Sequence, residues 1–261
     1  MVRSLPEGMQ RLVVAALATI ALMFALVSPV FGQATPEGSP VAGPPTPAVT
    51  LGDDQAAISI VHASAAVPAV DILLDDQVAL PNVSFGTVSE FLNVDSGDHN
   101  VKVVPAGGDV SQALVDSDVT LDSGKVYAVV AAGTAEEPEV KAFEINNDPT
   151  ANDAIRLMAI HAASSVDAID IAPVMGDPVI EDLSFFNASD SVDYTGQTVD
   201  LEVRATGEIG SLAVLPSFPA MSGSSIAVIV TTDAQGQPLP LYVGTFPGTE
   251  ADDEEVATPA A

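Results

Sequence analysis

Two stretches of the sequence place a histidine nine residues before an aspartate, with serines between them. The pairs are His62 with Asp71 and His161 with Asp170. A hydroxyl, an imidazole base and an orienting carboxylate are the groups that nucleophilic hydrolysis needs, so an extracellular hydrolase is one hypothesis. None of the intervening serines sits in the Gly-x-Ser-x-Gly turn of hydrolases. We therefore expect a repeated structural motif and no catalytic residue: each histidine closes a strand and hydrogen-bonds across the following loop, to the aspartate or to backbone.

The two histidines belong to an internal repeat. Residues 62–72 recur 99 positions later as residues 161–171, and six of the eleven positions are identical. The match continues where residues 83–85 (VSF) correspond to residues 183–185 (LSF). We expect two tandem copies of one module. A motif that is present once in each of two diverging copies favours a structural role over a catalytic one.

Metal binding is a second chemistry that these side chains could support. The histidines are His62, His99 and His161, and because no two are close in sequence, a zinc site is not expected. Calcium prefers carboxylate oxygens, but no Asp-x-Asp-x-Asp-Gly loop ending in a glutamate is present. We expect no cofactor, and a calcium-stabilised surface protein is kept as an alternative. The candidate carboxylate groups are Asp53-Asp54, which are adjacent, Asp75-Asp76, for which a turn is predicted, and Asp116 with Asp118 and Asp122.

The elements that must position these residues are predicted to be short strands. Between residues 113 and 121, apolar residues alternate with aspartates and a threonine, which is typical of a strand with one solvated face. Residues 126–132 are apolar on both faces, as in a central strand. The pattern predicts an all-β fold of two tandem antiparallel, immunoglobulin-like β-sandwich modules, with a small barrel as the alternative. The strands predicted in the first copy are 58–62, 70–74, 100–105, 113–121, 126–132 and 140–145.

The composition excludes several classes of protein. Seven basic residues against 36 acidic ones give a formal net charge of −29, so no basic surface for nucleic acid is expected. Hydrophobic residues make up 48% of the chain, which is enough for a buried core and argues against disorder throughout. The absence of cysteine rules out disulfides, thiolate metal sites and a cysteine nucleophile.

The two ends of the chain differ in composition from the repeats. Arg3 and Arg11 precede an apolar run that ends at Ser28 and Pro29, which is the order of a signal peptide. An uncleaved membrane anchor is the alternative, because the run is slightly long for a signal peptide. The predicted organisation is a signal peptide (1–34), a Pro/Gly-rich spacer (35–55), a first module (56–146), a linker (147–154), a second module (155–247) and an acidic tail (248–261).

Several ordered motifs of the first copy match one known pattern. They are His62-Ala63-Ser64, Pro68-Ala69-Val70-Asp71, Val83-Ser84-Phe85-Gly86, Val88-Ser89, Pro105-Ala106-Gly107, Val119-Thr120-Leu121, Gly124-Lys125 and Tyr127. In these motifs the chain resembles the bacterial extracellular family catalogued as domain of unknown function 4397, over residues 57–145 and, with fewer matches, over residues 155–246. The second copy departs from the pattern at Asp167, Phe186, Ser224 and Ile226, which replace Pro68, Gly86, Lys125 and Tyr127. The resemblance implies exported, often tandem β-rich modules with no established activity.

Together these observations predict an exported, non-enzymatic protein that is secreted or held at the cell surface. Its expected work is binding, adhesion or a structural role with an unknown partner in the envelope or outside the cell. Nucleic acid is not expected as a partner. Contact with a membrane is expected only through the N-terminal segment, if that segment is not cleaved.

Overall fold

Most of the described chain is β-structure. The computed structural model describes residues 49–148, 150, 154–195, 198–219 and 222–245. The predicted signal peptide, residues 35–48 of the spacer and the acidic tail therefore lie outside the described residues. Within the described ranges, the only helical element is a 3-10 turn at Val110–Gln112, and no helix there is long and apolar enough to cross a membrane.

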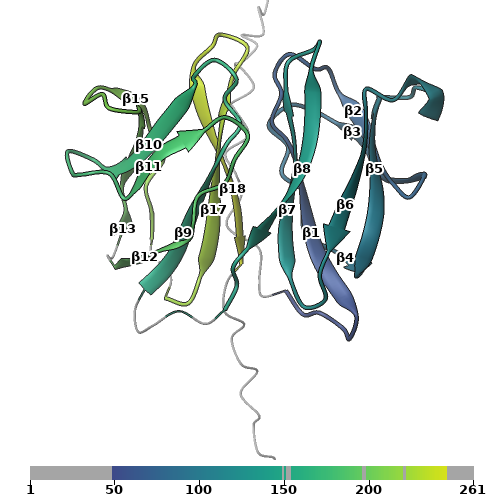
Figure 1. Ribbon diagram of the computed structural model, residues 1–261, viewed down its shortest axis with the longest axis horizontal. Coiled ribbons are helices and arrows are strands. Elements are labelled where there is room, and N and C mark those ends of the chain that lie inside the picture. Colours follow the sequence, from purple (N-terminus) through teal and green to yellow (C-terminus); the bar gives the residue numbers. More distant parts are fainter. Residues whose placement is uncertain (1–48, 149, 151–153, 196–197, 220–221, 246–261) are drawn as a thin grey trace, which may run out of the picture. The chain divides into compact units, whose positions relative to one another are not determined.

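The first part of the chain forms a sandwich of two four-stranded sheets (Figure 1). One sheet has the order β4-β1-β7-β8, and the other has the order β3-β2-β5-β6. The strands are β1 (Gln55–His62), β2 (Val70–Leu74), β3 (Gln77–Val83), β4 (Leu92–Asp95), β5 (Gly97–Pro105), β6 (Val115–Leu121), β7 (Val126–Gly133) and β8 (Pro138–Ile145).

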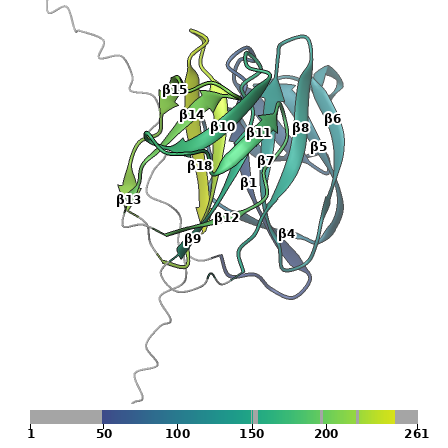
Figure 2. The same ribbon diagram turned by 60° about the vertical axis from the view of Figure 1, so that its left-hand side comes forward.

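The second part of the chain forms another sandwich with the same strand order (Figure 2). Its sheets are β12-β9-β17-β18 and β11-β10-β14-β15, with a further two-stranded pair, β13-β16. The strands are β9 (Ala154–His161), β10 (Ala168–Pro173), β11 (Ile180–Ser184), β12 (Val192–Thr195), β13 (Thr198–Val199), β14 (Leu201–Ala205), β15 (Ser211–Val214), β16 (Phe218–Pro219), β17 (Ser225–Thr232) and β18 (Pro238–Thr245).

The predicted β-sandwich class is confirmed, but the pairing is not wholly antiparallel. Strand β1 runs parallel to β7, and β9 runs parallel to β17. Sequence patterns alone do not reveal this, because alternation reports which face is buried and not the direction of the neighbouring strand. Strands β3 and β4 were not predicted, since β3 lacks a clear alternation and contains Pro81, and β4 has four residues.

Each sandwich has its own core, and a third cluster joins them. Strand β7 shows why residues 126–132 are apolar on both faces. Tyr127 and Val129 pack inside the first sandwich, whereas Ala128 and Val130 belong to a cluster that also contains Ile160 and other residues of the second sandwich. The outward face of β7 is therefore buried as well.

Polar contacts accompany this shared cluster. The Thr231 hydroxyl donates to the Ala63 carbonyl, and Ser64 forms an isolated parallel bridge with Thr232. Lys141 Nζ donates to the Phe186 carbonyl at 3.0 Å. Residues 63–64 directly follow β1, so the loop after the first histidine is also part of the contact with the second sandwich.

Candidate functional site

The two histidines of the repeated motif have the same surroundings. Each is the last residue of a buried strand, β1 or β9, and is at most 1% exposed. His62 Nε2 lies 3.2 Å from the Pro68 carbonyl oxygen, and its Nδ1 accepts from the Ser64 N–H at 3.4 Å. His161 Nε2 lies 2.9 Å from the Val166 carbonyl oxygen, and its Nδ1 accepts from the Ala163 N–H at 3.2 Å. Both nitrogens of each ring therefore bind the backbone of the loop that follows.

Burial keeps both imidazoles neutral. It lowers the pKa of His62 and of His161 below the ordinary histidine value, and the hydrogen bonds to the loop carbonyls offset only part of this effect. The nearby serine hydroxyls bind elsewhere: Ser64 Oγ donates to the Gly133 carbonyl at 2.7 Å, and Ser165 Oγ is 3.1 Å from Thr232 Oγ1. A general base needs a free lone pair within reach of a hydroxyl proton, and these hydrogen bonds occupy both nitrogens.

The two aspartates bind a different set of loops. Asp71 accepts from the Asn82 N–H at 2.7 Å and from the Gly107 N–H at 2.8 Å. Asp170 accepts from the Asp182 N–H at 2.8 Å and from the Thr206 hydroxyl at 3.0 Å. Of the two expected partners of each histidine, the structure therefore shows the backbone and not the aspartate.

The aspartates hold two strained residues that sequence reasoning missed. Asn82 (φ 52°) and Asp182 (φ 51°) adopt left-handed backbone conformations near irregularities in the β2-β3 and β10-β11 pairing. Their N–H groups are the ones that Asp71 and Asp170 accept from. These hydrogen bonds, first from Asn82 and then from Gly107, lower the pKa of Asp71. Asn and Asp tolerate this backbone conformation better than most residues. Their occurrence at corresponding positions of the two sandwiches was the sequence signal that could have predicted it.

A phenylalanine packs against each histidine. Phe85 meets His62 edge to face with ring centroids 6.4 Å apart, and Phe185 meets His161 in the same way at 5.9 Å. Phe186 is 2% exposed, and its ring contacts Phe143 of the first sandwich. Each histidine ring is thus packed against an aromatic ring in addition to its hydrogen bonds with the loop that follows it.

The third histidine forms a pair that the sequence did not suggest. His99 Nδ1 is 2.7 Å from Asp75 Oδ2, and His99 Nε2 is 2.7 Å from the Asp95 carbonyl oxygen. Both partners are acceptors, so the protonated ring, which carries a proton on each nitrogen, satisfies both contacts. Burial alone lowers the pKa of His99, but the bonds to Asp75 and Asp95 outweigh it and raise the pKa above its ordinary value.

Four of the carboxylates considered for calcium, those of Asp75, Asp76, Asp116 and Asp118, are engaged with other side chains. The Asn100 amide donates to Asp116 at 2.7 Å and to Asp118 at 2.9 Å. Lys102 Nζ is 2.5 Å from Asp76. At Asp122 the structure shows a backbone contact, in which its N–H donates to the Tyr127 hydroxyl at 3.0 Å. Among the residues that the structure describes, no three histidine or acidic side chains are grouped to hold a metal ion.

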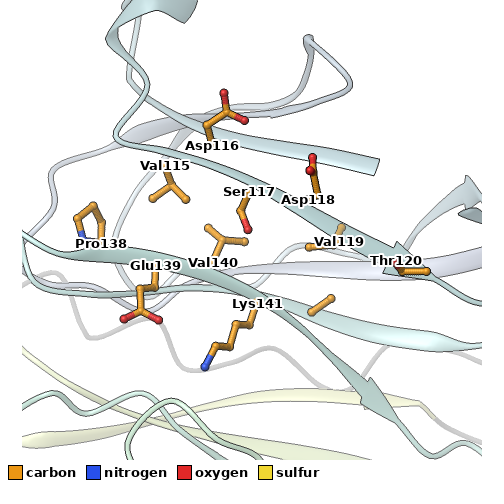
Figure 3. Close-up of a pocket in the computed structure, with 11 residues that line it drawn as sticks. Val115, Asp116, Ser117, Asp118, Val119, Thr120, Pro138, Glu139, Val140 and Lys141 are labelled. Carbon is orange, nitrogen blue, oxygen red and sulfur yellow. The ribbon is translucent and has the colours of Figure 1, made fainter. Parts of the chain in front are cut away.

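A groove of about 540 Å³ runs between β6 and β8, the last strands of the two sheets of the first sandwich. Figure 3 shows Val115, Ser117 and Val140 pointing toward one another between these strands. Asp116 projects from the opposite side of β6, and Lys141 from the opposite side of β8. A second groove, of about 600 Å³, lies between β11 and β12 of the second sandwich. Both grooves are seams between the two sheets of a sandwich.

Comparisons with known proteins give a family resemblance over part of the chain. No curated protein matches the sequence. One family model matches, once, over residues 56–172, which include the first sandwich from β1 onward and the first two strands of the second. The resemblance inferred from the motifs is confirmed for that one match. The matched family is described as Domain of unknown function (DUF4397).

Proposed function

We propose that this protein is an exported, non-catalytic binding protein built from two copies of one β-module, the second of which spans the strands from β9 to β18. The two sandwiches serve as a rigid scaffold, and their edges and loops contact a partner in the envelope or outside the cell. The equal strand order of the two sandwiches supports the assignment of a second copy.

The observation that carries the proposal is the state of the repeated motif. His62 and His161 are neutral, buried and bonded to backbone through both nitrogens. Asp71 and Asp170 accept from the backbone of turns. These histidines and aspartates fix the conformation of loops through hydrogen bonds. Neither histidine has a ring nitrogen available to act as the general base that activates a nucleophile.

The acidic surface supports a binding role outside the cell. The five cations of the described ranges each have a partner within the chain: Asp76 for Lys102, Glu144 for Lys125, the Phe186 carbonyl for Lys141, Asp193 for Arg156 and Glu202 for Arg204. The remaining surface charge is therefore negative. Such a surface favours solubility and association with cationic or neutral partners.

Two measurements test the proposal. A fluorophosphonate probe, which labels activated serines, is expected to leave the full chain unlabelled at pH 7 and pH 8, while a serine hydrolase in the same tube is labelled. Labelling that is lost in His62→Gln would show that the motif is catalytic. For export, cell fractionation with N-terminal sequencing is expected to find the protein outside the cytoplasm, beginning after the apolar run; a cytoplasmic protein would contradict the proposal.

A further inference from the structure

The second sandwich exposes a group of large apolar side chains. Met175 and Ile209 are each 94% exposed, and Val214 is 62% exposed. Together with Val174 and Leu212 they form what we call the β15 patch. Val174 and Met175 lie in the turn after β10, Ile209 lies in the turn before β15, and the other two lie on β15 itself.

Contacts of Glu202 link the turn that carries Met175 to β15. Glu202 on β14 is paired in register with Val214 on β15. The same carboxylate accepts hydrogen bonds from the Met175 backbone and the Ser211 hydroxyl. It also binds Arg204, with Nε at 2.9 Å, and both side chains of this ion pair are 9% exposed. The charge of Glu202 is thus compensated within the sheet, and the patch carries no net charge of its own.

The equivalent edge of the first sandwich is protected. Strand β6 is the last strand of its sheet, as β15 is of the corresponding sheet. Lys102 on β5 is paired with Asp116, where Glu202 is paired with Val214. Charged side chains on an edge strand discourage pairing with other chains, and Asp116 projects from the outside of β6 (Figure 3). An apolar residue at the same register position leaves the edge of β15 open to pairing.

The surroundings of the patch are acidic. Asp177 and Glu208 are exposed in the same two turns as Met175 and Ile209. A second copy of this chain would bring another surface of the same sign, because the cations of its described residues are already paired. A partner with basic groups beside apolar ones complements both the centre and the rim of the patch.

We propose that the edge of β15 binds an extended, cationic segment of a partner, which adds as a further strand to the sheet β11-β10-β14-β15. Backbone hydrogen bonds to β15 provide affinity, as in other cases of strand addition. Leu212 and Val214 pack against the apolar residues of the added strand, and Asp177 and Glu208 attract its lysine or arginine residues. This inference rests on the proposed binding function and names the class of partner.

The test uses the full chain and a fluorescein-labelled, eight-residue peptide of alternating lysine and valine, with a glutamate–valine peptide as control. Fluorescence anisotropy is expected to show binding of the lysine peptide alone. Val214→Asp, which places the residue type of Asp116 at the equivalent position, should weaken binding roughly tenfold. Because this substitution adds a negative charge, it should strengthen binding if attraction were merely electrostatic. Val78→Asp, at a 57% exposed valine on edge strand β3, is the matched control and should leave the affinity unchanged.

Four results would overturn the inference. Tighter binding by the Val214→Asp variant, or equal weakening by both variants, would indicate diffuse charge attraction or loss of folding, which circular dichroism distinguishes. A dimer in sedimentation equilibrium that Val214→Asp converts to a monomer would make a second copy the occupant of the edge. An absence of peptide binding by the unsubstituted chain would reject this class of partner. None of these results depends on the fluorophosphonate or fractionation measurements, so the proposed non-catalytic, exported function and the partner class can fail separately.

Discussion

His62 and His161 are buried histidines whose ring nitrogens fix the loops after β1 and β9. These loops lead to the strands that carry Asp71 and Asp170. The two aspartates accept hydrogen bonds from the backbone of the irregularly paired strands β3 and β11. A buried polar group that loses its hydrogen-bond partner lowers the free energy of unfolding by about 1–3 kcal/mol. The hydrogen bonds of these histidines and aspartates therefore contribute to the stability of the fold. The same burial sets their response to pH.

We expect acid to weaken the fold through these two residues. Above pH 6.5 both histidines are neutral in the folded and unfolded chain, so their stabilising effect is fully present. As the pH falls below 6.5, the unfolded chain takes up protons that the folded chain does not, because burial lowers the folded pKa, and the free energy of unfolding decreases. Urea unfolding between pH 5 and pH 8 measures this slope. In the double variant His62→Gln/His161→Gln the slope should flatten, at a cost of about 1–3 kcal/mol per site at pH 8; an unchanged slope would contradict the prediction.

Phe186 combines a strained backbone with a buried ring. Its φ is 54°, and the equivalent residue of the first sandwich, Gly86, has φ 80°. We expect Phe186→Gly to recover about 1 kcal/mol of backbone strain but to lose about 3–5 kcal/mol of packing, for a net destabilisation of roughly 2–4 kcal/mol in thermal or urea unfolding. Gly86→Ala is the companion variant, since it places a side chain at the equivalent left-handed position, and it should be destabilising as well. A Phe186→Gly variant as stable as the parent would show that the ring contributes little through its contacts with Phe143 and with Lys141 Nζ, which lies 4.7 Å from the ring centroid.

At the scale of the elements, His99 joins three parts of the first sandwich. It lies on β5, it binds Asp75 in the β2-β3 turn, and it binds the backbone of Asp95 at the end of β4. Because β4 and β5 belong to different sheets, the imidazolium links the two layers at this end of the sandwich. Asp75 also accepts from the Asn100 N–H at 2.9 Å, which together with His99 lowers the pKa of its carboxyl group.

This link should respond to pH in the opposite sense to the buried histidines. The folded pKa of His99 is raised, so its stabilising effect is fully present below pH 6.5 and is lost as the pH rises through the folded pKa. Nuclear magnetic resonance titration of the His99 ring is expected to give a pKa above 6.5 in the parent and a lower value in Asp75→Asn. Asp98→Asn, at the adjacent residue on β5, is the control. Equal titration in all three proteins would show that the Asp75 contact does not hold the proton.

The strands also show which features of the fold could be predicted from the sequence. The alternation in residues 113–121 correctly predicted a strand with one solvated face, and the double apolar face of residues 126–132 correctly predicted a central strand. The repeated loop was found from six identical positions, but its hydrogen bonds were not, because the choice between backbone and aspartate depends on where β3 and β5 bring their turns. The parallel pairs β1-β7 and β9-β17, the His99 link and the unprotected edge at Val214 all depend on register between distant strands. Register of this kind is not encoded in local periodicity.

At the scale of the whole molecule, the shared apolar cluster explains why strands β7 and β17 are apolar on their outward faces as well as on their inward faces. The outward faces of β7 and β17 carry small apolar residues, including Ala128 and Ala227, which are 0% exposed. A single sandwich would expose these faces as an apolar patch, which soluble proteins avoid unless the patch is an interface. Burial of both faces in one cluster ties the stability of each sandwich to the presence of the other.

The two sandwiches should therefore unfold together. In urea, the full chain is expected to show one transition by circular dichroism and by tyrosine fluorescence, since Tyr127 lies in the first core and Tyr242 packs against the second. Ala128→Asp buries an unpaired charge between the sandwiches and should lower the free energy of unfolding by at least about 3 kcal/mol, separating the transition into two. Ala106→Asp, at an exposed loop residue, is the control and should leave a single transition. Two transitions in the unsubstituted chain would show that the shared cluster adds little to either core, and that the apolar outward faces must be explained by another partner.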